Sequence, residues 1–550
     1  ASGVFHNSEK DGGLGRQDIE IVDIYWERIY LNIIFQGKNI EEYGVFLNSA
    51  TQSIKLELNN IGEDRYKSVI NITNITDVLM LKNENYKFII KGKDITQEIS
   101  ISKELGYKLE TLDKIYRYSN QNLAYTINFM PKEHNSKITC ILVSRYMLIN
   151  EKYYKEQIAG SKHPLRRAIF ILGKNCFNIM YKLFCLLHIN KKNKILLMSE
   201  TRAPISGNLK ALDERIKERN LDKKLKISYS FFKTLELSKK NVALKYLKLV
   251  WSLSKQEIVF VDDYCPIFKF IKLNSKTKLV QLWHAGVGFK SVGYARFGFS
   301  GPFPYTSCHR RYDYAVVGGE ALIPVYAEVF GINKKKILPC GLPRLDKFLD
   351  ENIVNSSKQK IYTNYSNIKE KNIILFAPTF RGSGQKTASY PFEKLDLNAI
   401  YELCKNENYV FLIKMHPFVR KRIKIPEEYK NYIIDLSDYP DINELFYVTN
   451  ILITDYSSNI YDFSLLNRPI IFYTFDLDSY QIINKVHRPI REYAPGKVCT
   501  EFKEVIETIK NKDFETNKLN KFREENFSIH KKSASDMIID NLILKNEKDD

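Results

Sequence analysis

Short runs of alternating apolar and polar residues dominate the first 150 residues of the chain. Segments such as SIKLELNN, ENYKFIIKGK and QEISISKE place apolar side chains at every second position and end at Asn, Gly or Lys. This period predicts β-strands, and several strands at this spacing predict a β-sandwich over residues 18–150. The polar, Gly-rich residues 1–17 precede it as a flexible segment. This region shows no cluster of His, Asp and Glu that would indicate a catalytic site. We therefore expect it either to bind and position a partner or to be a structural appendage.

From Ile195 onward, strand-like runs alternate with amphipathic helical runs. ILLMSE, EIVFVDDY and KLVQLWHAG alternate with stretches such as ALDERIKER, and a second set contains IILFAPTF, YVFLIKMHP and NILITDYSS. Two such sets in tandem predict an α/β fold with two Rossmann-like domains, residues 195–350 and 351–510, in a GT-B-like arrangement. A charged helical tail, residues 511–550, follows. The chain contains no GxGxxG fingerprint, which disfavours a nicotinamide enzyme.

The connector between the two regions, residues 151–194, combines bulky apolar and basic side chains. Its helical stretch begins near Pro164 and contains Phe170, Phe177, Tyr181 and Phe184 among Lys and Arg. Such a basic amphipathic helix suits a membrane surface, although a helix buried between domains would have a similar composition. No run approaches the ~20 uninterrupted apolar residues of a spanning helix. The sequence therefore predicts peripheral contact with an anionic membrane.

Composition narrows the class of protein further. Hydrophobic residues make up 44% of the chain and aromatic residues 13%, which indicates a globular protein. The net charge of +20 favours an anionic partner, such as nucleic acid, a membrane face or a phosphate-bearing substrate, unless it reflects a generally basic surface. No aromatic and basic module of the RNP type appears, so nucleic acid is not expected. The eight cysteines form no CxxC pair, which predicts neither a zinc site nor a disulfide framework and fits a reducing cytoplasm.

The segment Val448–Tyr473 reads as strand, turn, helix and strand. Its turn contains Asp455, Ser457 and Ser458 between a buried strand and a helix start. Unpaired N–H groups and the positive end of the dipole make a helix N-terminus suitable for a phosphate. The alternative interpretation is an ordinary capped helix.

Other polar residues follow apolar strands at the same kind of position. These residues are His284, Arg344, Thr379, Arg381 and His416. Ligands of open α/β sheets bind at the carboxyl ends of strands. A neutral imidazole can accept a hydroxyl proton near neutral pH, which makes the two histidines candidates for catalysis. His309 lies in a looser loop, where we expect a structural role.

Seven motifs in order carry a resemblance to a known family. They are QLWHAGVGFKSVGY, GLPRLDKF, FAPTFRG, KMHP, DINELF, ITDYSSNIYDF and NRPIIFY. Over roughly residues 195–507 the chain resembles the CDP-glycerol glycerophosphotransferase family of teichoic-acid polymerases and primases. The resemblance implies a GT-B fold and a CDP-glycerol or CDP-ribitol donor. It also implies release of CMP and a lipid-linked polyol-phosphate or glycan acceptor in teichoic-acid-like or capsular polymer synthesis. It further implies a peripheral location at the cytoplasmic face of the cell membrane. We expect no covalently bound cofactor and no metal-ligating residues, and the sequence leaves dependence on a divalent metal open.

The resemblance also implies roles for individual residues. His284 is the expected base on the acceptor hydroxyl, and Glu444 is expected to face the donor nucleotide or ribose. Residues expected around the donor pyrophosphate are His416, Thr379, Arg381, Asp455, Ser457 and Ser458. Further phosphate-binding candidates are Lys290, Arg344, Arg488 and Arg491.

The chain departs from the family pattern in several places. Asn484 occupies a position where the family usually has Arg, Pro489 one where it has Asp, and WHAGVGFK replaces the more usual WHGTPLKK. These differences leave the polyol undecided. Two other hypotheses stay open, a GT-B glycosyltransferase that uses a nucleotide-diphosphate sugar and a non-catalytic membrane scaffold.

Overall fold

The computed structural model describes most of the chain as two compact units. Unit 1 comprises residues 1–170 with 296–307, and unit 2 comprises residues 171–295 with 308–550. The described residues are 18–75, 80–118, 123–134, 137–148, 164–284, 292–296, 307–382, 384–478, 480, 488–527 and 533–544. Lys290, Asn484 and the predicted flexible segment 1–17 lie outside them. Sheets and helices together confirm the predicted mixed α/β class.

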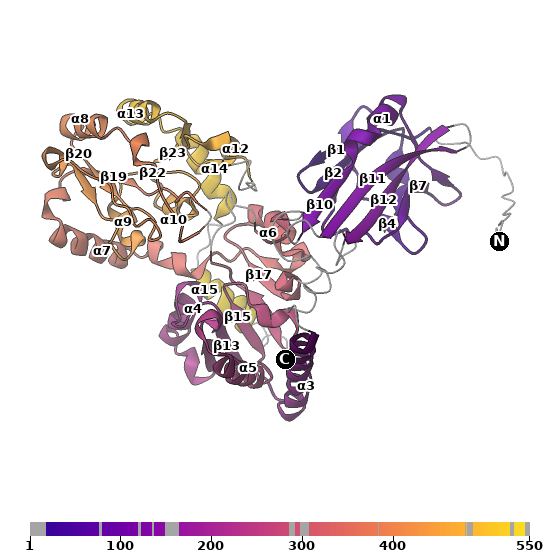
Figure 1. The fold of residues 1–550 in the computed structure, drawn as a ribbon, viewed down its shortest axis with the longest axis horizontal. Coiled ribbons are helices and arrows are strands. Elements are labelled where there is room, and N and C mark those ends of the chain that lie inside the picture. The colour runs from indigo at the N-terminus through magenta and orange to yellow at the C-terminus, as the bar shows by residue number, and fades with distance from the viewer. Residues whose placement is uncertain are drawn as a thin grey trace. The chain divides into compact units, whose positions relative to one another are not determined.

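Unit 1 consists mainly of β-strands, the class of element that the alternating pattern predicted for this region (Figure 1). They are β1 (Glu20–Glu27), β2 (Tyr30–Gln36), β3 (Gly44–Asn48), β4 (Ser53–Lys55), β5 (Asn59–Gly62), β6 (Arg65–Asn71), β7 (Asn85–Lys91), β8 (Thr96–Glu98), β9 (Ser100–Ile101), β10 (Lys114–Tyr118), β11 (Leu123–His134) and β12 (Lys137–Leu148). Hydrogen bonds connect these strands into one 12-stranded, mostly antiparallel sheet, next to the short helix α1 (Lys103–Lys108). Alternate residues of β7 are buried, because successive side chains of a strand point to opposite faces.

Unit 2 begins with a parallel sheet in the order β14-β13-β15-β16-β17-β18. The elements are β13 (Lys194–Ser199), α4 (Gly207–Glu218), β14 (Lys226–Phe231), α5 (Lys239–Leu253), β15 (Ile258–Val261), β16 (Lys278–Gln281), β17 (Tyr314–Val316), α6 (Ile323–Phe330) and β18 (Ile337–Leu338). The central strand β15 is buried along its whole length, as expected of a parallel strand covered on both faces. This sheet and its helices are called the first half of unit 2 below.

The second half of unit 2 is another parallel sheet, in the order β21-β20-β19-β22-β23-β24. Its elements are α7 (Glu351–Asn364), β19 (Asn372–Phe376), α8 (Leu397–Glu407), β20 (Tyr409–Ile413), β21 (Ile433–Asp435), α9 (Ile442–Val448), β22 (Ile451–Thr454), α10 (Asn459–Phe463), β23 (Ile470–Tyr473), α12 (Ile490–Tyr493), β24 (Lys497–Cys499) and α13 (Phe502–Asn511). The order corresponds to 3-2-1-4-5-6 within the sheet, which is that of classic doubly wound folds. In β19, Ile373 and Leu375 face the core that contains α9, whereas Ile374 and Phe376 face the core of α8 and α13.

The last helices are α14 (Thr516–Asn526), α15 (Ala534–Ile538) and a short C-terminal π-helix (Ile539–Ile543), and α15 packs on the first half. Ile538 and Ile539 share a core with β13 and α4. Asp536 accepts hydrogen bonds from Arg215 at 2.9 Å and from Arg219 at 3.0 Å. Buried apolar contacts and these ion pairs therefore hold the C-terminal region against the first half of unit 2.

Helix α3 (Pro164–Leu187) leads into the first half. Phe184 packs edge-on against Trp251 of α5, with the ring centroids 4.8 Å apart, and the Tyr181 hydroxyl accepts a hydrogen bond from the Asn274 N–H at 2.8 Å. Among the described residues, no helix combines the length and the apolar character needed to span a membrane.

Candidate active site

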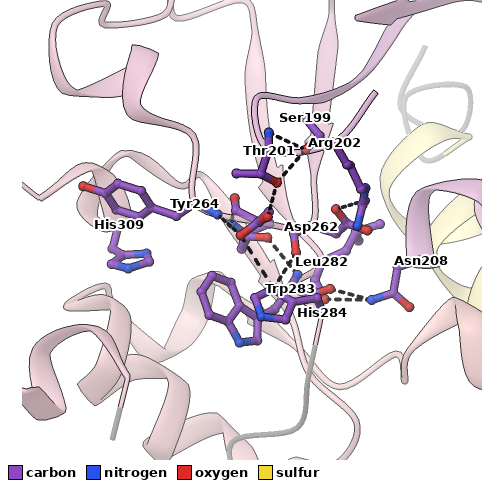
Figure 2. A network of polar contacts seen from close by, with 12 residues as sticks. Ser199, Thr201, Arg202, Asn208, Asp262, Tyr264, Leu282, Trp283, His284 and His309 are labelled. Carbon is purple, nitrogen blue, oxygen red and sulfur yellow. Dashed lines mark hydrogen bonds and ion pairs between the residues drawn. The ribbon is translucent and has the colours of Figure 1, made fainter. Parts of the chain in front are cut away.

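His284 lies just beyond the carboxyl end of β16 in the first half (Figure 2). Its Nδ1 atom is 3.1 Å from the backbone carbonyl oxygen of Asp262. A carbonyl oxygen can only accept a hydrogen bond, so Nδ1 must carry the proton. In the neutral ring Nε2 is then the basic nitrogen. The side chain is 48% exposed, so this arrangement suits a group that accepts a proton from a substrate.

Two carboxylates follow β15 beside His284. Asp262 is buried and forms an ion pair with Arg202, and burial raises the pKa of Asp262 despite that pairing. Asp263 is more exposed, and its Oδ1 atom lies 3.8 Å from His284 Nδ1. Thr201 donates a hydrogen bond to the other oxygen of Asp263 and so orients the carboxylate. Asp263 can therefore stabilise the imidazolium that forms when His284 takes a proton.

The backbone immediately before His284 adopts an unusual conformation. Trp283 has φ of 52°, in the left-handed region that bulky residues rarely adopt. The buried Asn208 donates through Nδ2 to the Trp283 carbonyl at 2.5 Å, and the Trp283 N–H donates to Gln281 Oε1 at 2.8 Å. Figure 2 shows Asn208 directed at this turn. These hydrogen bonds hold the turn that points His284 away from the strand.

We expect Asn208→Ala to lower turnover about 10-fold or more without unfolding the protein. The substitution removes the bonds to Trp283 and to the Arg344 N–H, which donates to Asn208 Oδ1 at 3.0 Å, so the strained turn can relax and misplace His284. Steady-state kinetics would show a fall in kcat with little change in the donor KM. Asn541→Ala, on the C-terminal π-helix, is the control, and equal kcat values for the two variants would contradict the positioning role.

His416 follows β20 in the second half, and its Nδ1 atom has the opposite hydrogen-bonding role to that of His284. The backbone N–H of Phe418 donates to His416 Nδ1 at 3.1 Å. This Nδ1 must therefore be unprotonated, and the neutral ring carries its proton on Nε2. The ring packs between Phe380 and Phe418, with centroid distances of 4.8 and 4.6 Å. His416 thus offers an N–H donor, which suits a phosphate oxygen, whereas His284 offers an acceptor.

Arg381 and Asp455, which follow β19 and β22 in the chain, form the centre of a buried network of hydrogen bonds. Arg381 donates to Asp455 at 2.9 Å and to both oxygens of Asp476 at 2.6 and 3.0 Å. Asp455 is fully buried and also accepts from the Thr379 N–H at 2.8 Å and the Thr379 hydroxyl at 2.7 Å. The structure thus directs Arg381 and Thr379 toward protein carboxylates, an arrangement that fixes the loop after β19.

The two serines of the turn between β22 and α10 differ in exposure. Ser457 is buried and its Oγ atom accepts a hydrogen bond from the Asn459 N–H at 3.1 Å. Ser458 is exposed. Ser457 therefore binds the backbone of the first residue of α10, and Ser458 presents its hydroxyl to solvent.

The remaining candidates are spread over unit 2. Arg344 forms a buried ion pair with Asp462 of α10, at 2.8 Å between Nη2 and Oδ1. Glu444 accepts a hydrogen bond from Lys360 at 3.0 Å. The guanidinium of Arg488 lies over the Tyr493 ring, 5.2 Å from its centroid. Arg491 is exposed on α12.

Sequence reasoning had singled out neither Asp263 nor Asn208. Asp263 carried a usable signal, because it follows a buried strand within VFVDDY, as the chosen candidates do. Asn208 carried none, since an Asn at the start of a helix is ordinary. His309 is buried against Trp283 and Phe330, and burial lowers its pKa to about 3. His309 is therefore neutral at physiological pH.

A family model and the curated relatives indicate one family, and a solved structure shows a similar fold. The family model described as CDP-Glycerol:Poly(glycerophosphate) glycerophosphotransferase matches residues 179–544. The teichoic acid ribitol-phosphate polymerase TarL of Staphylococcus aureus (strain NCTC 8325 / PS 47) is 30% identical over 96% of this chain and 99% of its own length. TarK from the same strain, also a teichoic acid ribitol-phosphate polymerase, is 36% identical over 70% of this chain and 76% of its own. A solved structure of the wall teichoic acid polymerase TagF superposes with a TM-score of 0.52 at 24% identity, covering 72% of this chain and 98% of that chain.

Proposed function

The chain belongs to the CDP-glycerol:poly(glycerophosphate) glycerophosphotransferase family, and from that membership we propose how it transfers a polyol phosphate. The donor is a CDP-activated polyol, and the acceptor is a hydroxyl of a growing teichoic-acid-type polymer. The two parallel sheets of unit 2 are the two Rossmann-like halves of a GT-B arrangement, and the strands of unit 1 form a sandwich-like accessory domain. The observation that supports the chemistry best is the half-exposed His284, whose protonated Nδ1 leaves Nε2 as the base.

In the proposed reaction, Nε2 of His284 takes the proton of the acceptor hydroxyl. The oxygen attacks the phosphorus that bears the polyol, a new P–O bond forms, and the bond from that phosphorus to the CMP oxygen breaks. CMP leaves with the bonding electron pair. Asp263 stabilises the imidazolium, and Nε2–H of His416 donates to a phosphate oxygen of the donor. Phosphoryl transfer depends mainly on such positioning and charge stabilisation.

The exposed Ser458 hydroxyl is proposed to contact the donor as well. Thr379, Arg381, Asp455 and Ser457 act indirectly, by holding the loops around the donor in place. Arg344 and Glu444, whose charges are paired within the protein, hold neighbouring elements together. Arg488 and Arg491 are the remaining phosphate-binding candidates on the second half.

We infer that the polyol is ribitol. TarL matches this chain over nearly the whole length of both proteins, and TarK matches it at 36% identity. A glycerol-phosphate primase of Bacillus subtilis (strain 168) is 30% identical over 59% of this chain. The similarity to these ribitol-phosphate polymerases therefore extends over more of this chain than the similarity to the glycerol-phosphate primase does.

Release of CMP tests this proposal. Purified protein is offered CDP-ribitol, CDP-glycerol or UDP-sugars with a lipid-linked polyol-phosphate acceptor. We expect CMP release with CDP-ribitol that depends on the acceptor. Preference for CDP-glycerol would overturn the ribitol assignment, and UDP release from a sugar donor would indicate a glycosyltransferase. No nucleotide release with any donor would favour a non-catalytic scaffold.

Helix α3 is proposed to attach the protein to the cytoplasmic face of the cell membrane. Phe184 and Tyr181 face the first half, whereas Ile179, Leu183 and Leu186 are 57%, 54% and 72% exposed. The last three lie at helical spacing and form one stripe. An apolar stripe beside lysines is what an interfacial helix requires.

We expect Ile179, Leu183 and Leu186 changed together to Asp to reduce binding to anionic vesicles at least 10-fold. Buried apolar side chains supply the part of the affinity that salt does not screen. Co-sedimentation with and without anionic lipid across a salt series measures this. Leu349→Asp, at another exposed leucine (68%), is the control. Unchanged sedimentation of the triple variant would place the membrane contact elsewhere.

A further inference from the structure

A basic cavity of about 400 Å³ opens on the second half of unit 2. Its lining contains three cations and one aromatic ring but no carboxylate. The lining residues are Gln385, Lys386, Ala388, Phe418, Arg420 and Lys421. A concave surface with a single sign of charge concentrates counter-ions, so this cavity favours an anionic ligand.

The three cations that line the cavity differ from the neighbouring Arg422, which is paired with a carboxylate. Arg422 donates to Asp438 at 2.6 Å. In the part of the chain that the structure describes, no ion pair involves Lys386, Arg420 or Lys421, and all three are exposed. The protein therefore pairs Arg422, beside the cavity, with a carboxylate. The three lining cations remain available to an anionic ligand.

Both walls of the cavity are anchored in elements of the candidate donor site. Phe418 packs on the His416 ring and gives its backbone N–H to His416 Nδ1. Lys386 lies on a hairpin whose base is closed by Arg381 and Ser389, at 2.7 and 2.9 Å between their backbone groups. Arg381 is in turn fixed by Asp455 and Asp476. The cavity thus adjoins the histidine assigned to the donor phosphate.

We propose that this cavity binds phosphodiester groups of the acceptor chain, an inference that rests on the proposed function. A polyol-phosphate polymer carries one negative charge per repeat, so several repeats can meet several cations at once. Such contacts would hold a long chain near the active site after each transfer and favour its further extension. A membrane surface fits less well, because the cavity is concave and Phe418, its one ring, is only 36% exposed.

Charge reversal tests the proposal by direct binding. A fluorescent, lipid-free poly(ribitol phosphate) fragment of about ten repeats serves as the probe. We expect the variant Lys386→Glu, Arg420→Glu, Lys421→Glu to bind it about 10-fold or more weakly at 0.1 M salt, because each lost pair contributes a fraction of a kcal/mol. The control reverses three exposed lysines of α8 and α13, Lys405, Lys503 and Lys510, for the same change in net charge.

Kinetic measurements distinguish binding of the acceptor chain in this cavity from binding of the donor. The cavity variant should show a raised KM for a long acceptor, with the KM for the CDP-polyol and for a single-repeat acceptor unchanged. Equal polymer binding by the wild type, the control and the cavity variant would overturn the proposal. So would a raised donor KM, or a loss of binding to anionic vesicles with polymer binding retained. The binding assay requires no turnover, so failure of the proposed transfer activity would be recognised separately.

Discussion

Replacing His284 by Ala should lower the rate of polyol-phosphate transfer about 10²–10⁴-fold, the usual contribution of a general base. The side chain is half exposed, so its removal takes one hydrogen bond from the Asp262 carbonyl but opens no cavity inside the core. The melting temperature should therefore change little. CMP release under saturating donor and acceptor, with circular dichroism on the same sample, measures both quantities.

His284→Asn provides a sharper control for the same assignment. The Asn amide nitrogen occupies roughly the place of Nδ1 and can donate to the Asp262 carbonyl, but the side chain offers no basic nitrogen. If His284 acts as a base, this variant should be as inactive as His284→Ala although the local hydrogen bond survives. Near-normal turnover of either folded variant would show that another group takes the proton.

Asp455→Ala should destabilise the second half of unit 2 by about 3–5 kcal/mol, because it leaves a buried guanidinium without one of its counter-charges. Asp455 is fully buried and bonds to Arg381 and to both donors of Thr379. Its loss therefore also frees the loop after β19. Amide hydrogen exchange in β19 and β22 reports on this half alone, which matters because a chain of several domains need not unfold in one step.

The double variant Asp455→Ala, Arg381→Met tests the reason for that loss. If the uncompensated charge dominates, removing the guanidinium as well should restore part of the protection against exchange. Equal exchange in the single and double variants would instead attribute the loss to the Thr379 hydrogen bonds. Protection unchanged from wild type in Asp455→Ala would contradict a structural role for the network.

Local pattern was enough to predict many of the elements of this protein. The alternation in ENYKFIIKGK (84–93) and the continuous apolar run in EIVFVDDY (257–264) are properties of neighbouring residues, and they correspond to β7 and β15. Backbone hydrogen bonding and the burial of apolar side chains follow the same local period. The order of the motifs along the chain was likewise enough to indicate the family, which the family model then matched over residues 179–544.

The tertiary structure decided what each polar side chain does. His284 and His416 occupy equivalent positions after apolar strands, yet their Nδ1 atoms meet a carbonyl in one case and an N–H in the other. Arg344 and Arg381 turn toward carboxylates 118 and 74 residues away in the chain. A hydrogen bond depends on the distance and direction between two groups, and the fold alone brings groups so distant in sequence together. The sequence therefore indicated which polar residues follow apolar strands, and only the folded chain determined which nitrogen carries a proton and which charges are paired within the protein.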